Sequence, residues 1–130
     1  MADTVIDRWH AYLKQRDDAL LDALITDDVV FHSPVVHTPQ KGKMLCKMYL
    51  QGAISVLGNS SFQYVNEWYS ANGAVLEFSA TIDGIVINGV DIIAWNDEQK
   101  ITEFKVLLRP LKAVNLMHQK MRAVLESMSN

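Results

Sequence analysis

The sequence predicts one small α+β domain in which helices and a curved antiparallel sheet close a cone around an apolar pocket. Three observations lead to this fold class. Apolar residues recur at helical spacing as far as Gly58, the period changes to two from Ser61 to Arg109, and helical spacing returns after Pro110. A run of helices followed by strands joined through tight turns is typical of an α+β meander. The length of 130 residues, with 49% hydrophobic residues, suits a single domain over residues 1–130.

The first two helices are expected to form a hairpin. The first runs from an Asp3-Thr4 cap to about Gln15, with an apolar face of Val5, Ile6, Trp9, Tyr12 and Leu13. The second begins at Asp17 or Asp18 and ends at Thr26-Asp27-Asp28, and its inward residues are Leu20, Leu21, Leu24 and Ile25.

A short strand and a third helix are expected to follow. The strand covers residues 29–32, which are β-branched or aromatic, and it bends at Pro34. Gly42 marks the start of the helix, and Gly58-Asn59-Ser60 ends it. Its residues at helical spacing, which should lie across the sheet, are Leu45, Met48, Tyr49, Ala53 and Val56.

Four longer strands are expected after residue 61. The first ends at the hairpin signal Asn72-Gly73, and one of its faces carries Phe62, Tyr64, Asn66 and Trp68. The others cover residues 74–82, 85–95 and 101–109, with turns at Asp83-Gly84 and Asn96-Asp97-Glu98 between them. Gly89, inside the third of these strands, indicates a bulge or a bend.

The tail, residues 111–128, predicts a C-terminal amphipathic helix. Its apolar stripe consists of Val114, Met117, Met121, Val124 or Leu125, and Met128. Such a stripe needs a partner, which is either the rim of the cone or a second subunit.

Composition disfavours several classes of partner. The formal net charge is −3 and the basic residues are scattered, so the sequence predicts no basic patch that would bind nucleic acid or an anionic membrane surface. The lone cysteine, Cys46, excludes an intrachain disulfide and a cysteine-based zinc framework, and we expect it to be a buried small hydrophobe. The start of the chain does not resemble a signal peptide, and no apolar run approaches ~20 residues. A cytoplasmic location is therefore expected.

The pattern of elements and motifs resembles the nuclear transport factor 2 superfamily over about residues 3–110. The resemblance rests on the segment from Leu24 to Pro34, on Gly42, on the segment Val90-Asp91-Ile92-Ile93, and on the following Lys100-Ile101. The chain is most similar to SnoaL-like polyketide cyclase and ketosteroid isomerase-type domains. The superfamily also includes scytalone dehydratase and limonene epoxide hydrolase, so the resemblance implies a cone-shaped fold more strongly than any one reaction.

The isomerase pattern maps onto three positions of this chain. The resemblance places its oxyanion-side carboxylic acid on Asp91, its helix-1 tyrosine on Trp9 and its general base on Ser33. Tryptophan has no ionisable hydroxyl, and serine cannot abstract a proton unaided at neutral pH. Two of the three roles are altered, which argues against steroid isomerisation by that enzyme's mechanism.

Asp91 is the strongest candidate for chemistry, because it interrupts an apolar strand at a position that is inward in the related folds. Desolvation should raise its pKa, so that it either donates a hydrogen bond as a neutral acid or acts as a general base. His32 is a candidate proton carrier beside it, with Ser33 as the third candidate. Strand alternation sends His32 away from the pocket if Ser33 faces it, unless the bend at Pro34 re-aims the imidazole.

An aromatic and aliphatic set is expected to wall the pocket. These candidate ligand-binding residues are Trp9, Tyr12, Tyr49, Trp68, Phe78, Ile93, Trp95, Phe104 and Val106. They suit a hydrophobic small molecule with one or two polar anchors, whereas ordinary core packing is the competing reading for each residue taken alone. No metal-ligand spacing, Gly-rich phosphate loop or nucleophile elbow occurs, so we expect neither metal nor cofactor.

The residue pattern of the last expected strand indicates the character of the sheet face that points away from the pocket. Its other face mixes apolar and charged residues, namely Ile101, Glu103, Lys105, Leu107 and Arg109, which suits a homodimer interface as well as a solvated surface.

Two functions from different classes are compatible with these features. The first is a cofactor-independent enzyme, an isomerase, dehydratase, cyclase or hydrolase, that uses acid–base chemistry on a hydrophobic ligand. The second is a non-catalytic module of the same fold that binds a ligand or another protein. A dimerisation unit with a completely filled core is a third, purely structural reading.

Overall fold

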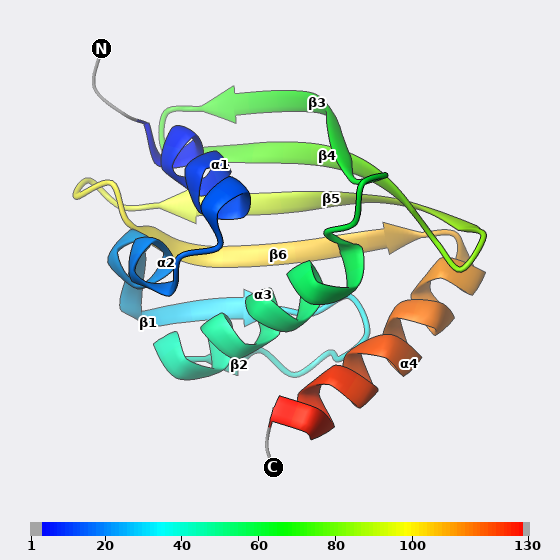
Figure 1. The fold of residues 1–130 in the computed structure, drawn as a ribbon. Coiled ribbons are helices and arrows are strands. Elements are labelled where there is room, and N and C mark those ends of the chain that lie inside the picture. The colour runs from blue at the N-terminus through cyan, green and yellow to red at the C-terminus, as the bar shows by residue number, and fades with distance from the viewer. Residues whose placement is uncertain (1–3, 129–130) are drawn as a thin grey trace.

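The computed structural model describes residues 4–128, and Figure 1 shows their arrangement. The elements in chain order are α1 (Val5–Gln15), α2 (Asp18–Leu24), β1 (Ile25–His32), β2 (Gln40–Lys41), α3 (Lys43–Leu57), β3 (Gln63–Ser70), β4 (Gly73–Ile82), β5 (Ile85–Trp95), β6 (Ile101–Arg109) and α4 (Leu111–Met128). Helices and a curved sheet thus make up an α+β fold, as the sequence predicts.

All six strands belong to one sheet, with the order β2-β1-β6-β5-β4-β3. The strands from β3 to β6 form an antiparallel meander, but β1 runs parallel to β6. The sheet is therefore mixed and not wholly antiparallel as expected. The physical reason is that no tight turn joins β1 to β6, so the connection does not impose antiparallel pairing.

The first strand begins earlier than the sequence predicts. Ile25 was expected to end the second helix, but it opens β1, is completely buried and pairs with Ile101 of β6. The register shifts between Ile25 and Val30, so the polar residues between them lie at an irregularity of the strand and not at a helix end. Long-range pairing with β6 thus overrides the local helix-stop signal.

The turn signals are confirmed with one small shift. Asp83 and Gly84 connect β4 to β5 with φ angles of 52° and 79°, as a tight hairpin of the predicted kind requires. Ser70 pairs with Gly73, so the loop between β3 and β4 is Ala71-Asn72, one residue before the predicted turn.

Gly89 does not form a bulge, because the pairing of β5 with both neighbours continues through it in regular register. A Cβ atom at this position would lie 2.6 Å from Cζ of Phe78 and 2.6 Å from the carbonyl oxygen of Leu107. The glycine thus gives room to the Phe78 ring on the strand that carries Asp91.

Three helices cover the concave face of the sheet (Figure 1). α1 begins with a capping box in which the Thr4 hydroxyl accepts from the Asp7 N–H and the Asp7 carboxylate accepts from the Thr4 N–H. Asp3, the other half of the expected cap, lies outside the described residues. α3 buries Cys46 and Leu50, whereas Leu45, expected on the inner face, is exposed. The inner stripe of α3 is therefore rotated relative to the prediction.

The C-terminal helix finds its partner within the same chain. α4 packs along α3 and against β5 and β6, and it buries Met117 and Met121. A side chain at Gly52 of α3 would meet Met121, so the two helices approach each other closely. No helix within residues 4–128 is long and apolar enough to cross a membrane.

Candidate functional site

Asp91 lies in the centre of the concave face of the sheet. Its neighbours across the ladder are Leu76 on β4 and Val106 on β6. The residue is 6% exposed, and within residues 4–128 it is the only buried charged or polar residue. A carboxyl at such a position costs free energy unless it is protonated or hydrogen-bonded.

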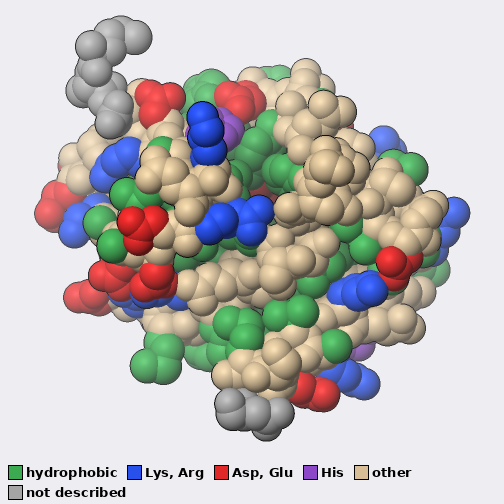
Figure 2. All heavy atoms as spheres, viewed as in Figure 1, with side chains coloured by type: hydrophobic (Ala, Val, Ile, Leu, Met, Phe, Trp, Pro, Cys, Tyr) green, Lys and Arg blue, Asp and Glu red, His purple; other side chains and the backbone are tan. Residues whose placement is uncertain are grey.

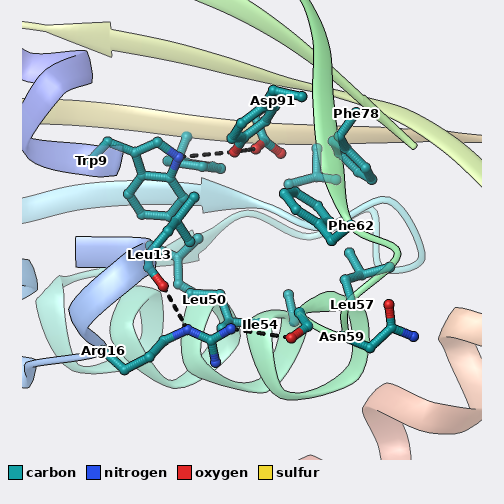
Figure 3. Close-up of a pocket in the computed structure, with 15 residues that line it drawn as sticks. Trp9, Leu13, Arg16, Leu50, Ile54, Leu57, Asn59, Phe62, Phe78 and Asp91 are labelled. Atoms are coloured by element: carbon teal, nitrogen blue, oxygen red, sulfur yellow. Dashed lines mark hydrogen bonds between the residues drawn. The ribbon is translucent and has the colours of Figure 1, made fainter. Parts of the chain in front are cut away.

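A chain of hydrogen bonds leads to this carboxyl group. The indole Nε1–H of Trp9 donates to the Tyr64 hydroxyl at 2.9 Å, and that hydroxyl donates to Oδ2 of Asp91 at 2.6 Å (Figure 3). α1 provides the indole, while β3 provides the tyrosine opposite Phe78. Among the described residues Oδ1 of Asp91 has no hydrogen-bond partner, so it is available to a molecule in the cavity.

Burial raises the pKa of Asp91 to about 7, although the hydrogen bond from Tyr64 opposes this rise. The pKa of Tyr64 is raised well above its ordinary value, first by burial and then by the Asp91 charge. Tyr64 therefore stays protonated at neutral pH, while Asp91 can both accept and release a proton there.

A cavity of about 230 Å³ opens beside this carboxyl group. Residues of α1 and its C-cap, of α3, of the sheet and of the segment between α3 and β3 line it: Trp9, Leu13, Arg16, Leu50, Ala53, Ile54, Leu57, Gly58, Asn59, Phe62, Tyr64, Phe78, Asp91, Phe104 and Val106. Figure 2 shows this face hollowed, with hydrophobic side chains in the hollow and Lys or Arg side chains at its edge. Polar groups are thus few in a largely apolar enclosure.

Five of the candidate residues line this cavity together, namely Trp9, Phe78, Phe104, Val106 and Asp91. The other candidates lie outside it. Tyr12 packs against Trp9, with ring centroids 5.6 Å apart, and Tyr49 stacks on Phe31 at 5.4 Å. Ile93 is buried in the core. Trp95 is the last residue of β5 and lies beyond the part of this strand that pairs with β4.

The placement predicted for Trp68 was wrong, because this side chain is 55% exposed. The register of β3 shifts between Tyr64 and Asn66, so Tyr64 faces the same side as Phe78 but Trp68 pairs with the outward-facing Val75. One additional residue in a strand reverses the inside–outside alternation after it. The bulge at Val65 therefore turns Trp68 to the convex face.

His32 and Ser33 do not join Asp91. His32 pairs with Lys105 across the ladder and contacts Oε2 of Glu103 at 2.7 Å, while its neighbour Phe31 takes the inward position. Ser33 accepts a hydrogen bond from the backbone N–H of Val35. Neither residue lines the cavity. Alternation along β1 turns His32 outward, and the bend at Pro34 does not re-aim the imidazole, whereas Ser33 lies beyond the end of the strand.

Three polar residues of the cavity, Tyr64, Arg16 and Asn59, were missed from the sequence. Tyr64 could have been found, since a buried carboxyl needs a donor and Tyr64 shares its predicted face with Phe62. Arg16 carries no comparable signal, because its position depends on how α1 approaches the end of α3.

Two other sequence expectations concern reactive groups. Cys46 is buried, as predicted, and burial raises its pKa to about 12, which makes it a poor nucleophile. Within residues 4–128, no group of three His, Cys, Asp or Glu side chains could hold a metal ion.

The sequence profile of the SnoaL-like domain family matches residues 6–104 of the chain. No curated protein matches its sequence. Among solved structures, a steroid delta-isomerase from Pseudomonas aeruginosa is 31% identical, with a TM-score of 0.89 over 95% of this chain and 90% of that chain.

Two further structures of unassigned function share the fold. An uncharacterised protein with a cystatin-like fold from Silicibacter pomeroyi is 27% identical, with a TM-score of 0.84 over 93% of this chain and 84% of that chain. A nuclear transport factor 2-like protein from Mesorhizobium loti is 20% identical, with a TM-score of 0.68 over 82% of this chain and 88% of that chain.

Proposed function

Since this chain belongs to the SnoaL-like domain family, we propose that it is an enzyme that moves a proton within a small apolar carbonyl compound. The observation that carries the proposal is the state of Asp91. This carboxyl group is buried beside a cavity, has one oxygen without a partner among residues 4–128 and has a pKa of about 7. A group of this kind can act as a base when ionised and as an acid when protonated.

Isomerisation is the reaction class that one such group supports best. Ionised Asp91 takes a proton from the carbon next to the carbonyl, and the C–H electron pair passes to the carbonyl oxygen as an enolate. The protonated carboxyl then returns the same proton to a different carbon, so neither water nor a co-reactant is consumed. Once Asp91 is neutral, the Tyr64 hydroxyl is freer to donate to the oxyanion.

Dehydration, hydrolysis and cyclisation require more catalytic groups than isomerisation does. Each needs a second group that activates water, protonates a departing oxygen or guides a new bond. Among the described residues that line the cavity, no other side chain is a carboxyl, an imidazole or a thiol. The proposal therefore favours an internal proton shift over these reactions.

The cavity volume and the named relative point to the substrate. A cavity of about 150 Å³ admits benzene, so about 230 Å³ suits a ligand of one or two rings. The Pseudomonas aeruginosa structure carries the name steroid delta-isomerase, and its reaction class agrees with a double-bond shift. We propose the same class of reaction on a smaller ketone.

The test is conversion of 3-cyclohexen-1-one into its conjugated isomer, followed by ultraviolet absorbance. Because the free enzyme must hold Asp91 as a base, kcat/KM is expected to fall tenfold per pH unit below about pH 7. A β,γ-unsaturated steroid ketone is expected to be a poorer substrate. No conversion of any β,γ-unsaturated ketone, or a rate independent of pH between 5 and 8, would count against the proposal.

In the Tyr64→Phe variant, the pH below which kcat/KM falls is expected to be higher than in the wild type by about one unit. The tyrosine hydrogen bond favours the ionised carboxyl, so its removal raises the pKa of Asp91 further. Tyr69→Phe is the matched control, because Tyr69 lies on the same strand but is exposed and lines no part of the cavity. If kcat/KM of Tyr64→Phe depends on pH in the same way as kcat/KM of the wild type, protonation of Asp91 does not cause the fall in rate at low pH.

We also propose that the protein is a homodimer formed through the convex face of the sheet. This face carries exposed apolar side chains, including Trp68 and Leu107, of which Leu107 is 51% exposed. Leu107→Glu is expected to halve the mass measured by light scattering without loss of the fold, since it places a charge in an apolar contact. Leu111→Glu changes a leucine at the start of α4 that is even more exposed, and it should not change the mass. A wild-type monomer would contradict this proposal.

A further inference from the structure

Arg16 stands at the mouth of the cavity, on the side opposite Asp91 (Figure 3). It follows α1 directly and caps it with a left-handed backbone, at a φ of 57°. Glycine is the usual residue at such a position, and any other residue costs free energy there. An arginine at this position therefore indicates a role for the side chain.

The guanidinium group is held in place by two carbonyl groups at helix ends. Its Nε donates to the Leu13 carbonyl oxygen at 2.9 Å, and its Nη2 donates to the Gly58 carbonyl oxygen at 3.3 Å. A Cβ atom on Gly58 would lie 2.4 Å from Nη2, so the missing side chain of Gly58 leaves the space that Arg16 occupies. The cation is thus positioned across the end of α1 and the end of α3.

Its charge and most of its donors remain available. A guanidinium group has five N–H donors, and these two contacts use two of them. Within residues 4–128 Arg16 makes no ion pair, although two aspartates follow it in sequence. Asp17 caps α2 through the Ala19 N–H, and Asp18 pairs with Lys47 at 2.8 Å.

Asn59, the other polar side chain at this end of the cavity, is already engaged. Its Nδ2 donates to the Thr81 carbonyl oxygen at 3.0 Å, while its Oδ1 accepts from the Ser61 backbone N–H at 2.8 Å. Arg16 is therefore the group at the mouth with the most unused hydrogen-bonding capacity.

We propose that the cavity selects a substrate with a carboxylate at the end that remains at the mouth, where Arg16 binds it. The planar guanidinium matches a carboxylate in geometry, and an anion is better placed at the mouth than beside Asp91. This inference rests on the proposed function, which orients the carbonyl end of the substrate toward Asp91. The substrate class is then a cyclic keto acid of one or two rings.

The test uses a matched pair of probes, 6-hydroxy-2-naphthoate and its methyl ester, with affinity measured by fluorescence titration. The naphthol hydroxyl stands in for the enol at the Asp91 end, and only the acid offers a carboxylate at the other end. The wild-type protein is expected to bind the acid about tenfold more tightly than the ester, and the preference should weaken in high salt. Arg16→Gly should remove the preference by weakening the acid alone, whereas Arg16→Lys should keep part of it.

Two controls make the result specific. Arg16→Gly should not lower the midpoint of thermal unfolding, because glycine suits the left-handed cap. Lys14→Ala removes an exposed cation of the same helix that does not line the cavity, and it should leave the preference intact. Equal wild-type affinity for acid and ester, or a preference that survives Arg16→Gly, would overturn the carboxylate inference alone. Binding of neither probe would overturn the proposed function as well.

Discussion

Asp91→Asn is expected to lower kcat by about a thousandfold while the fold and ligand affinity change little. General acid–base catalysis by one positioned group contributes roughly 10²–10⁴-fold, and the proposed reaction uses this one group for both proton transfers. Asparagine has the same shape and can still accept the Tyr64 hydrogen bond, but it cannot take up a proton. Steady-state kinetics with 3-cyclohexen-1-one, together with probe titration, separates the two effects.

Asp97→Asn is the matched control, since Asp97 is exposed in the turn between β5 and β6 and lies outside the cavity. It should leave kcat unchanged. Turnover that survives Asp91→Asn would dismiss the role assigned to Asp91. If the wild type binds the probes but turns over no ketone, the protein is instead a ligand-binding module of the same fold, which is the alternative that the sequence leaves open.

The second large effect is on stability as a function of pH. The pKa of Asp91 rises from 3.8 to about 7 on folding, so between these values the folded state binds the proton more tightly than the unfolded state. This contribution is fully present below about pH 4 and is lost as the pH rises through about 7. Folding stability attributable to Asp91 should therefore decrease by roughly 3 kcal/mol between pH 5 and pH 8.

The informative quantity is the difference between two proteins, because it isolates the contribution of Asp91 to the free energy of unfolding. Urea unfolding of the wild type and of Asp91→Asn at several pH values gives this difference directly. Asp91→Asn should gain stability relative to the wild type as the pH rises, because it removes the charge that must be buried. A difference independent of pH would mean that the carboxyl has an ordinary pKa in the folded protein.

Local signals in the sequence determined much of the fold. The Thr4 cap, the glycine before α3, the Asp83-Gly84 turn and the proline after β6 act through backbone conformation and short-range hydrogen bonds. The bounds predicted for the strands of residues 85–95 and 101–109 agree with the structure for this reason. Strand alternation also placed Asp91 inward, since the pairing of β5 with both neighbours is regular from Asn88 to Ala94.

The tertiary structure decided which of the sequence candidates meet at the site and which further residues join them. A one-residue bulge at Val65 turned Trp68 outward, and the approach of α1 to α3 brought Arg16 to the mouth of the cavity. The parallel pairing of β1 with β6, which places Phe31 inward and His32 outward, joins segments far apart in the chain. Such contacts depend on the register and packing of distant elements, and short-range patterns do not encode them. The sequence could therefore nominate the buried carboxyl, and it held a signal for the tyrosine that supports it, but it held none for the arginine opposite it.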